Sequence, residues 1–201
     1  MTRTLLCIAC IGTVVIPAVR AQVQGYRPVT AAELANPSPN DWLSFSRTYD
    51  DQRFSPLNQI TRQNVGQLRM AWSRGTPAGT VESTPLVRGG TMYIMTATGG
   101  VMALNATNGD LLWEYTRPQP PAPAAPAAGA AGGGRGAAPA AGGRGAPARV
   151  YNSRSKTFSI FDDLIFYTAP DSNVVGLDAR TGELRWQSKV DTRGNSSGTI
   201  M

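Results

Sequence analysis

The sequence predicts an all-β fold made of repeated four-stranded antiparallel sheets, and three observations lead to this prediction. An eleven-residue pattern that ends in tryptophan occurs twice, over residues 103–113 and 176–186. Each copy follows short segments rich in β-branched and aromatic residues, separated by glycine-containing turns. Tryptophans recur about every 40 residues once a biased insert is set aside. This period is typical of the four-stranded blades of a β-propeller.

The first 21 residues predict a secretory signal peptide. Arg3 supplies a positive start, an apolar run follows from Leu5 to Ala18, and residues 19–21 permit cleavage before Gln22. The apolar run is shorter than the roughly 20 residues needed to cross a bilayer. We therefore expect a periplasmic protein with no membrane span in the mature chain. The alternative is a retained N-terminal anchor helix.

The composition of the mature chain excludes several kinds of chemistry. Both cysteines, Cys7 and Cys10, lie in the predicted signal, and the chain contains no histidine. The rest of the chain therefore has no thiol or imidazole for a zinc site, a c-type haem, or Ser/His and Cys/His catalysis. The net charge is +6, but six arginines lie in the signal or in the biased insert. The remainder carries 13 basic and 13 acidic residues, a balance that argues against nucleic-acid binding.

The repeat and the composition divide the chain into segments. Residues 22–40 form an N-terminal extension, and residues 41–116 hold the opening segment and the first full blade. Residues 117–149 contain 28 alanine, glycine or proline residues among 33. This composition predicts a disordered insert, because such a segment buries too little apolar surface to offset the entropy of ordering. Residues 150–201 hold the second blade and the start of the next.

Each blade is expected to contain four short strands. Gly109 and Gly182 fall in the tight turn before the last strand, where a positive φ is needed. Trp113 and Trp186 would then lie flat between neighbouring blades, each donating its indole N–H to a backbone carbonyl. The predicted strands are Thr84–Val87, Thr91–Thr96, Val101–Asn105 and Leu111–Tyr115 in the first blade, and Thr157–Phe161, Leu164–Thr168, Val174–Leu177 and Leu184–Ser188 in the second.

Two blades do not close a ring, because an open end leaves unpaired edges and half-buried faces. The expected structure is therefore a partial β-propeller, an incomplete ring. On this interpretation the chain is an N-terminal fragment of a longer one.

The segment from residue 41 to residue 60 carries a family resemblance. Residues 41–45 read Asp-Trp-Leu-Ser-Phe and residues 49–60 read Tyr-Asp-Asp-Gln-Arg-Phe-Ser-Pro-Leu-Asn-Gln-Ile. They resemble the opening segment of alcohol dehydrogenases that depend on pyrroloquinoline quinone (PQQ), and residues 64–68 and 71–72 continue the match. The repeats of the form Ala-x-Asp-x-x-x-Gly-x-x-x-Trp resemble the tryptophan-docking motifs of the same family, with Asn105 at the first Asp position.

The resemblance implies an eight-bladed propeller that binds PQQ and calcium near its axis. It further implies oxidation of an alcohol or a similar hydroxyl substrate by hydride transfer to the quinone. An acceptor such as a cytochrome c or a quinone would then receive the electrons. The fragment alone is expected to be inactive, because the family's calcium ligands and catalytic aspartate belong to later blades. No catalytic or metal-ligating residue is therefore assigned.

The resemblance also implies three cofactor contacts in this chain. Glu82 matches the family's glutamate beside the quinone, and Ser196 matches a hydroxyl position. Lys156 falls where the family usually has an arginine, with Arg154 two residues earlier, and the sequence leaves open which of the two faces the cofactor. Many relatives have a vicinal disulfide just before this basic position, and no cysteine stands there in this chain.

Two functions remain open from the sequence. The first is the N-terminal part of a periplasmic PQQ-dependent dehydrogenase, which the opening segment, Glu82 and the basic pair favour. The alternative is a non-catalytic PQQ-like propeller that acts as a protein-binding scaffold. The missing cysteines and the lysine at position 156 favour this alternative.

Overall fold

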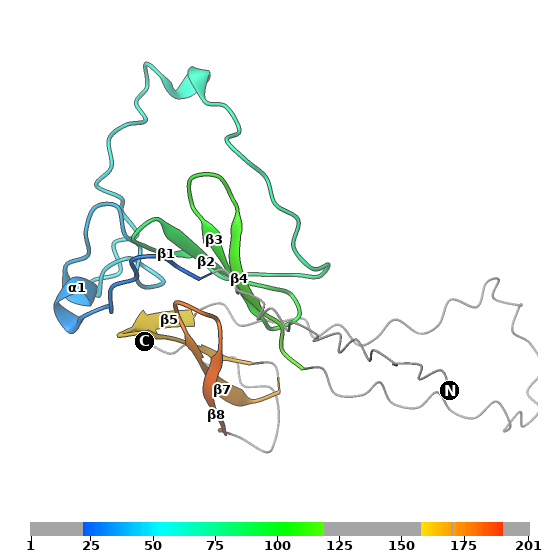
Figure 1. Cartoon of the computed structure of the whole chain (residues 1–201). Helices are drawn as coiled ribbons and strands as arrows, with labels where there is room; N and C mark the ends of the chain where they lie inside the picture. Colours follow the sequence, from blue (N-terminus) through cyan, green and yellow to red (C-terminus); the bar gives the residue numbers. More distant parts are fainter. Residues whose placement is uncertain (1–21, 119–157, 170, 191–201) are drawn as a thin grey trace, which may run out of the picture.

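The computed structural model describes residues 22–118, 158–169 and 171–190, and it contains two four-stranded antiparallel sheets (Figure 1). A short helix, α1 (Ala31–Ala35), and a 3-10 turn, η1 (Val65–Gln67), precede the sheets. The first sheet has the order β1 (Leu86–Arg88), β2 (Thr91–Met95), β3 (Val101–Asn105) and β4 (Leu111–Tyr115). The second has the order β5 (Phe158–Phe161), β6 (Leu164–Thr168), β7 (Asn173–Asp178) and β8 (Leu184–Lys189). All eight predicted strands are present, although β1 begins two residues later than expected.

Several sequence predictions fall outside this description. The predicted signal peptide, most of the biased insert, and residues Arg154, Lys156 and Ser196 are not among the described residues. Over the described ranges, no helix has the length and apolar character needed to cross a bilayer. The turn η1 lies on a long loop that extends away from both sheets (Figure 1).

The two sheets are copies of one structural unit, as their pairing shows. Tyr93 pairs with Ala103 across β2 and β3, and Phe166 pairs with Gly176 across β6 and β7. The pairing with the last strand shifts register directly after Ala103 in the first sheet and directly after Gly176 in the second. Such irregularities bend a strand and increase its twist. Their recurrence at equivalent positions confirms that the repeated pattern encodes a repeated structure.

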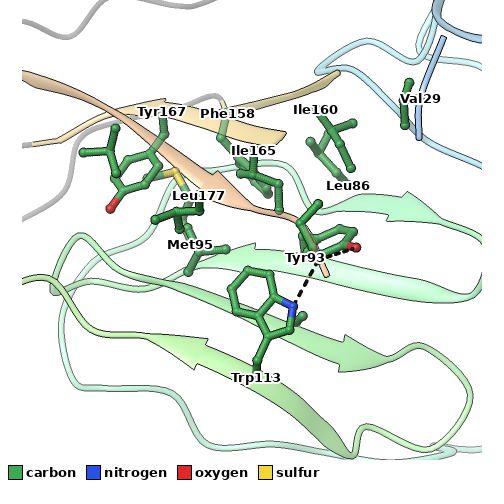
Figure 2. Packing of buried hydrophobic residues seen from close by; sticks show 14 of the residues in the cluster. Val29, Leu86, Tyr93, Met95, Trp113, Phe158, Ile160, Ile165, Tyr167 and Leu177 are labelled. Carbon is green, nitrogen blue, oxygen red and sulfur yellow. Dashed lines mark hydrogen bonds between the residues drawn. The ribbon is translucent and has the colours of Figure 1, made fainter. Parts of the chain in front are cut away.

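The hydrophobic core lies between the two sheets (Figure 2). Because side chains alternate along a strand, each sheet contributes one of its faces to this core. Residues with 2 % or less of their surface exposed include Leu86, Tyr93, Met95, Val101 and Ala103 from the first sheet, and Phe158, Ile160, Ile165, Tyr167 and Leu177 from the second. The opposite face of the second sheet takes no part in this cluster.

Buried phenols add polar contacts across the core. Tyr93 donates its hydroxyl to the carbonyl oxygen of Ala179 at 3.1 Å, and Tyr167 donates to the carbonyl oxygen of Gly99 at 2.8 Å. Burial raises the pKa of both phenols, so they remain protonated donors. These bonds satisfy polar groups that would be costly to bury without partners.

The N-terminal segment covers the free edges of the first strands of both sheets. Trp42 forms an isolated bridge with Val87 of β1, and Val29 forms one with Asp162, directly after β5. The amide of Val29 donates to the carbonyl of Asp162 at 2.9 Å, and the reverse bond is 2.8 Å long. Unpaired strand edges are prone to pair with other chains, so this segment protects two of them. It also joins the two sheets.

Arg88 anchors this segment through a buried ion cluster. Its side chain is 4 % exposed and contacts Asp41 Oδ2 at 3.0 Å and Glu33 Oε1 at 2.8 Å. Asp41 also accepts a hydrogen bond from the amide of Gly89 at 2.9 Å. Glu33 belongs to the capping box of α1 together with Thr30. Hydrogen bonds to the Thr30 backbone and to Arg88 lower the pKa of the Glu33 carboxyl.

A second ion pair fixes the end of the first sheet. Arg117, which composition assigns to the biased insert, is 6 % exposed and lies 2.5 Å from Asp171 Oδ2. Asp171 stands in the connection between β6 and β7. Burial alone would raise the pKa of Asp171, but its contact with Arg117 leaves that pKa below the usual value. The folded part of the chain therefore includes Arg117 and ties it to the second sheet.

Candidate functional site

Two tryptophans dock on the turn of the sheet that follows them in the chain. Trp113 of β4 is 5 % exposed and donates its indole N–H to the carbonyl of Ala179 at 3.1 Å. Its ring covers Gly182, where an added Cβ would overlap the indole. Trp72 donates to the carbonyl of Ala106 at 3.1 Å and covers Gly109, where a Cβ would lie 2.5 Å from the ring. The predicted position of Trp113 between neighbouring sheets is confirmed.

The turns that receive these rings have the predicted local chemistry. Gly109 and Gly182 have φ values of 76° and 74°, a region that other residues rarely adopt. Asn105 Oδ1 accepts the amide of the residue two positions later at 2.8 Å, and Asp178 Oδ1 does the same at 2.9 Å. Self-bonding of this kind explains why Asn or Asp stands at the start of both turns.

Trp186 lies in a different environment from Trp113. It is 40 % exposed, and its ring is tilted against Phe166 with 5.9 Å between ring centroids. The described residues contain no third sheet that could receive this indole. Its expected place between blades therefore stays a prediction.

We expect Gly182→Ala to lower the free energy of unfolding by about 2–3 kcal/mol. The new methyl group must displace the Trp113 ring, and the positive φ adds about 1–2 kcal/mol of backbone strain. Chemical denaturation followed by circular dichroism measures the change. Gly89→Ala is the matched control, because Gly89 has a φ of 56° but open space around its Cβ position. Equal losses in the two variants would show that the indole contact contributes nothing.

Glu82 stands at the beginning of the first sheet, on the stretch that leads into β1. Its side chain is exposed, and it precedes Leu86 by four residues. A carboxylate at this place can accept hydrogen bonds from a bound group or hold a cation. No cluster of three or more acidic side chains suited to a metal ion occurs in the described part of the chain.

The pairing of the strands relates Glu82 to the predicted basic pair. Leu86 pairs with Tyr93 in the first sheet as Ser159 pairs with Phe166 in the second, so Leu86 and Ser159 are equivalent. Four positions before Ser159 stands residue 155, which Arg154 and Lys156 flank in the sequence. The carboxylate and the basic pair therefore occupy equivalent sequence positions ahead of successive sheets.

The structure also contains a cavity that the sequence analysis missed. It has a volume of about 580 Å³ and lies between the N-terminal segment and the second sheet. None of the predicted cofactor contacts lines it. The large side chains that line it are Leu34, Leu43, Phe45, Tyr49, Ile160, Phe161 and Phe166. Alternation along β5 placed Phe161 away from the core, but only the fold brings α1 and residues 43–51 to the same place.

Comparison with known proteins gives a consistent set of similarities. Residues 42–152 match the PQQ family described as the β-propeller domain of glucose/ethanol/alcohol dehydrogenases. The dehydrogenase subunit of a quinone alcohol dehydrogenase from Gluconobacter oxydans is 33% identical over 92% of this chain and 22% of its own length. Quinohemoprotein alcohol dehydrogenase ADH-IIG from Pseudomonas putida is 34% identical over 87% of this chain and 21% of its own length.

Solved structures agree with these relatives. A europium-containing methanol dehydrogenase has a TM-score of 0.60 and 27% identity, and the match covers 84% of this chain and 26% of that one. The quinohemoprotein ADHIIG structure has a TM-score of 0.58 and 26% identity, and covers 83% of this chain and 22% of that one. The chain thus spans about a fifth of the length of the curated relatives it matches.

Proposed function

Because the chain belongs to the PQQ-binding glucose/ethanol/alcohol dehydrogenase β-propeller family, we propose that it is the N-terminal part of a dehydrogenase that oxidises an alcohol. Its two sheets are consecutive blades of a partial β-propeller. The family match over residues 42–152 is the observation that carries this proposal. The relatives named above are alcohol and methanol dehydrogenases, which supports an alcohol as the substrate class.

The residues of this chain would bind and orient the cofactor. Glu82, exposed ahead of β1, would accept hydrogen bonds from the quinone. Lys156 or Arg154 would place a positive charge beside a quinone oxygen, and only an arginine could bind it through a guanidinium fork. The hydroxyl of Ser196 would donate a hydrogen bond to a quinone carboxylate. Bound PQQ would supply the hydride acceptor for the oxidation.

The remaining parts of the proposal concern the whole protein. The catalytic base and the calcium ligands would come from blades outside this chain. A periplasmic location would follow from export by residues 1–21. A cytochrome c or a quinone would take the electrons. One relative is a lanthanide-dependent methanol dehydrogenase, so reconstitution should compare calcium with a lanthanide.

We expect Glu82→Gln in the full-length protein to weaken PQQ binding by about ten- to a hundredfold. Losing the charge from one charge-assisted hydrogen bond costs about 1.5–3 kcal/mol, which corresponds to this range. Equilibrium dialysis against PQQ, with calcium or a lanthanide present, measures the affinity. Dye reduction by ethanol measures turnover.

Glu114→Gln serves as the control, because Glu114 is an exposed glutamate on β4, away from the start of β1. Both variants should unfold at the same denaturant concentration. If full-length protein binds no PQQ with either metal and reduces no dye, the dehydrogenase proposal is wrong, and the scaffold alternative takes its place.

A further inference from the structure

The second sheet leaves one face uncovered. Phe158 and Ile160 of β5 point into the core, so Ser159 and Phe161 point away from it. We define the free face as Ser159, Phe161, Phe166, Gly176 and Trp186. Two of its large side chains are far from buried, Phe161 at 44 % and Trp186 at 40 %. Every residue of β8 is exposed as well.

The repeat shows what the free face corresponds to in the first sheet. Four of its residues, Ser159, Phe166, Gly176 and Trp186, occupy the positions of Leu86, Tyr93, Ala103 and Trp113. In the first sheet these four positions are between 0 and 5 % exposed, because the second sheet covers them. The same row in the second sheet therefore has the pattern of an interface without its partner.

The free face continues into the cavity. Phe166 contacts Trp186 at one end, and it lines the cavity together with Leu43 and Phe45 at the other. An apolar surface thus runs from the N-terminal segment to the last strand of the second sheet. Surfaces of this kind mark interaction sites, since isolated exposed apolar residues are the usual case in soluble proteins.

We propose that the free face docks a third four-stranded sheet of the same repeat, supplied by the remainder of the same polypeptide in the full-length protein. The chain covers about a fifth of its relatives' length, which leaves ample chain for this sheet. The docked turn would carry a glycine with positive φ, and the residue three positions earlier would offer its carbonyl to Trp186. Ala106 with Gly109 and Ala179 with Gly182 have this arrangement.

A second copy of this chain fits the free face less well. Its two glycine turns, at Gly109 and Gly182, are already covered by its own Trp72 and Trp113. It would therefore have no open turn to offer Trp186. The proposal depends on family membership and on the repeat, and it does not depend on the proposed oxidation of an alcohol.

The test appends a copy of residues 158–190 to the end of the chain through a glycine/serine linker. The indole N–H of Trp186 is then followed by hydrogen exchange in NMR spectra. We expect its exchange to slow by on the order of a hundredfold, as for a buried and bonded amide. The appended tryptophan, which has no following sheet, should remain unprotected. Changing the appended copy's glycine turn residue to valine should remove the protection of Trp186.

Unchanged exchange at Trp186 beside a folded appended sheet would overturn the proposal. Equal protection in the unmodified chain, with sedimentation showing a dimer, would assign the face to a second copy and overturn it as well. If the appended sheet fails to fold, Trp186→Ala in the full-length protein decides. We expect that variant to lower Tm as much as Trp113→Ala does, and an unchanged Tm would reject the third sheet whether or not the protein oxidises alcohols.

Discussion

Trp113→Ala is expected to lower the free energy of unfolding by about 4 kcal/mol, because it removes a large ring from the contact between the two sheets. Trp113 is 5 % exposed, packs at 5.8 Å from the Tyr93 ring, and covers Gly182. Its loss leaves a cavity and one acceptor bond fewer at Ala179. Urea denaturation followed by circular dichroism measures the change.

Two further variants separate the contributions of Trp113. Trp113→Phe keeps much of the ring and loses the indole N–H, so about 1 kcal/mol of the loss should belong to the hydrogen bond. Trp186→Ala in this chain should cost about 1 kcal/mol or less, since the ring is 40 % exposed. Similar losses at Trp113 and Trp186 would contradict the interface assigned to Trp113.

Arg88→Met should destabilise the chain by about 3–5 kcal/mol. Removing one partner of a buried ion pair leaves an uncompensated charge, here on Asp41, whose side chain is 7 % exposed. Methionine retains most of the apolar stem, so the loss reports mainly on the charge. Thermal unfolding and urea denaturation at neutral pH both measure it.

Arg185→Met is the matched control for Arg88. Arg185 also contacts two carboxylates, those of Asp163 and Asp178, but its side chain is 48 % exposed. Solvent screens such pairs, and its loss should cost about 1 kcal/mol or less. Adding Asp41→Asn to Arg88→Met should restore part of the stability, because it removes the stranded charge. A double variant as unstable as Arg88→Met alone would show that the cluster acts through packing.

Local sequence signals predicted the strands and docking turns well. Gly182 and Asp178 carry their conformation in their own chemistry, one by lacking a Cβ and the other by bonding the next turn. The bounds of β3, β4 and β6 are those that the sequence predicted. Thr30 and Glu33 held a capping-box signal for α1, which went unused.

Contacts between distant segments were beyond reach of the sequence. Nothing in the pattern around Val29 or Trp42 indicates that they pair with residues after β5 and in β1. The same holds for Arg88, whose partners lie at least 47 residues earlier. Arg117 was misread by composition, because its pairing with Asp171 depends on the second sheet. The candidate site was predicted only through resemblance, and of its residues the structure describes Glu82 alone.

The carbonyl of Ala179 receives two donors from the first sheet, the hydroxyl of Tyr93 on β2 and the indole of Trp113 on β4 (Figure 2). Two donors converging on one oxygen from different strands resist rotation of either sheet, since any tilt would lengthen one bond. In a closed ring the angles between neighbours must add up to a full turn. This single oxygen therefore sets the angular step between the first two blades, and an error in that step would have to be shared among all the others.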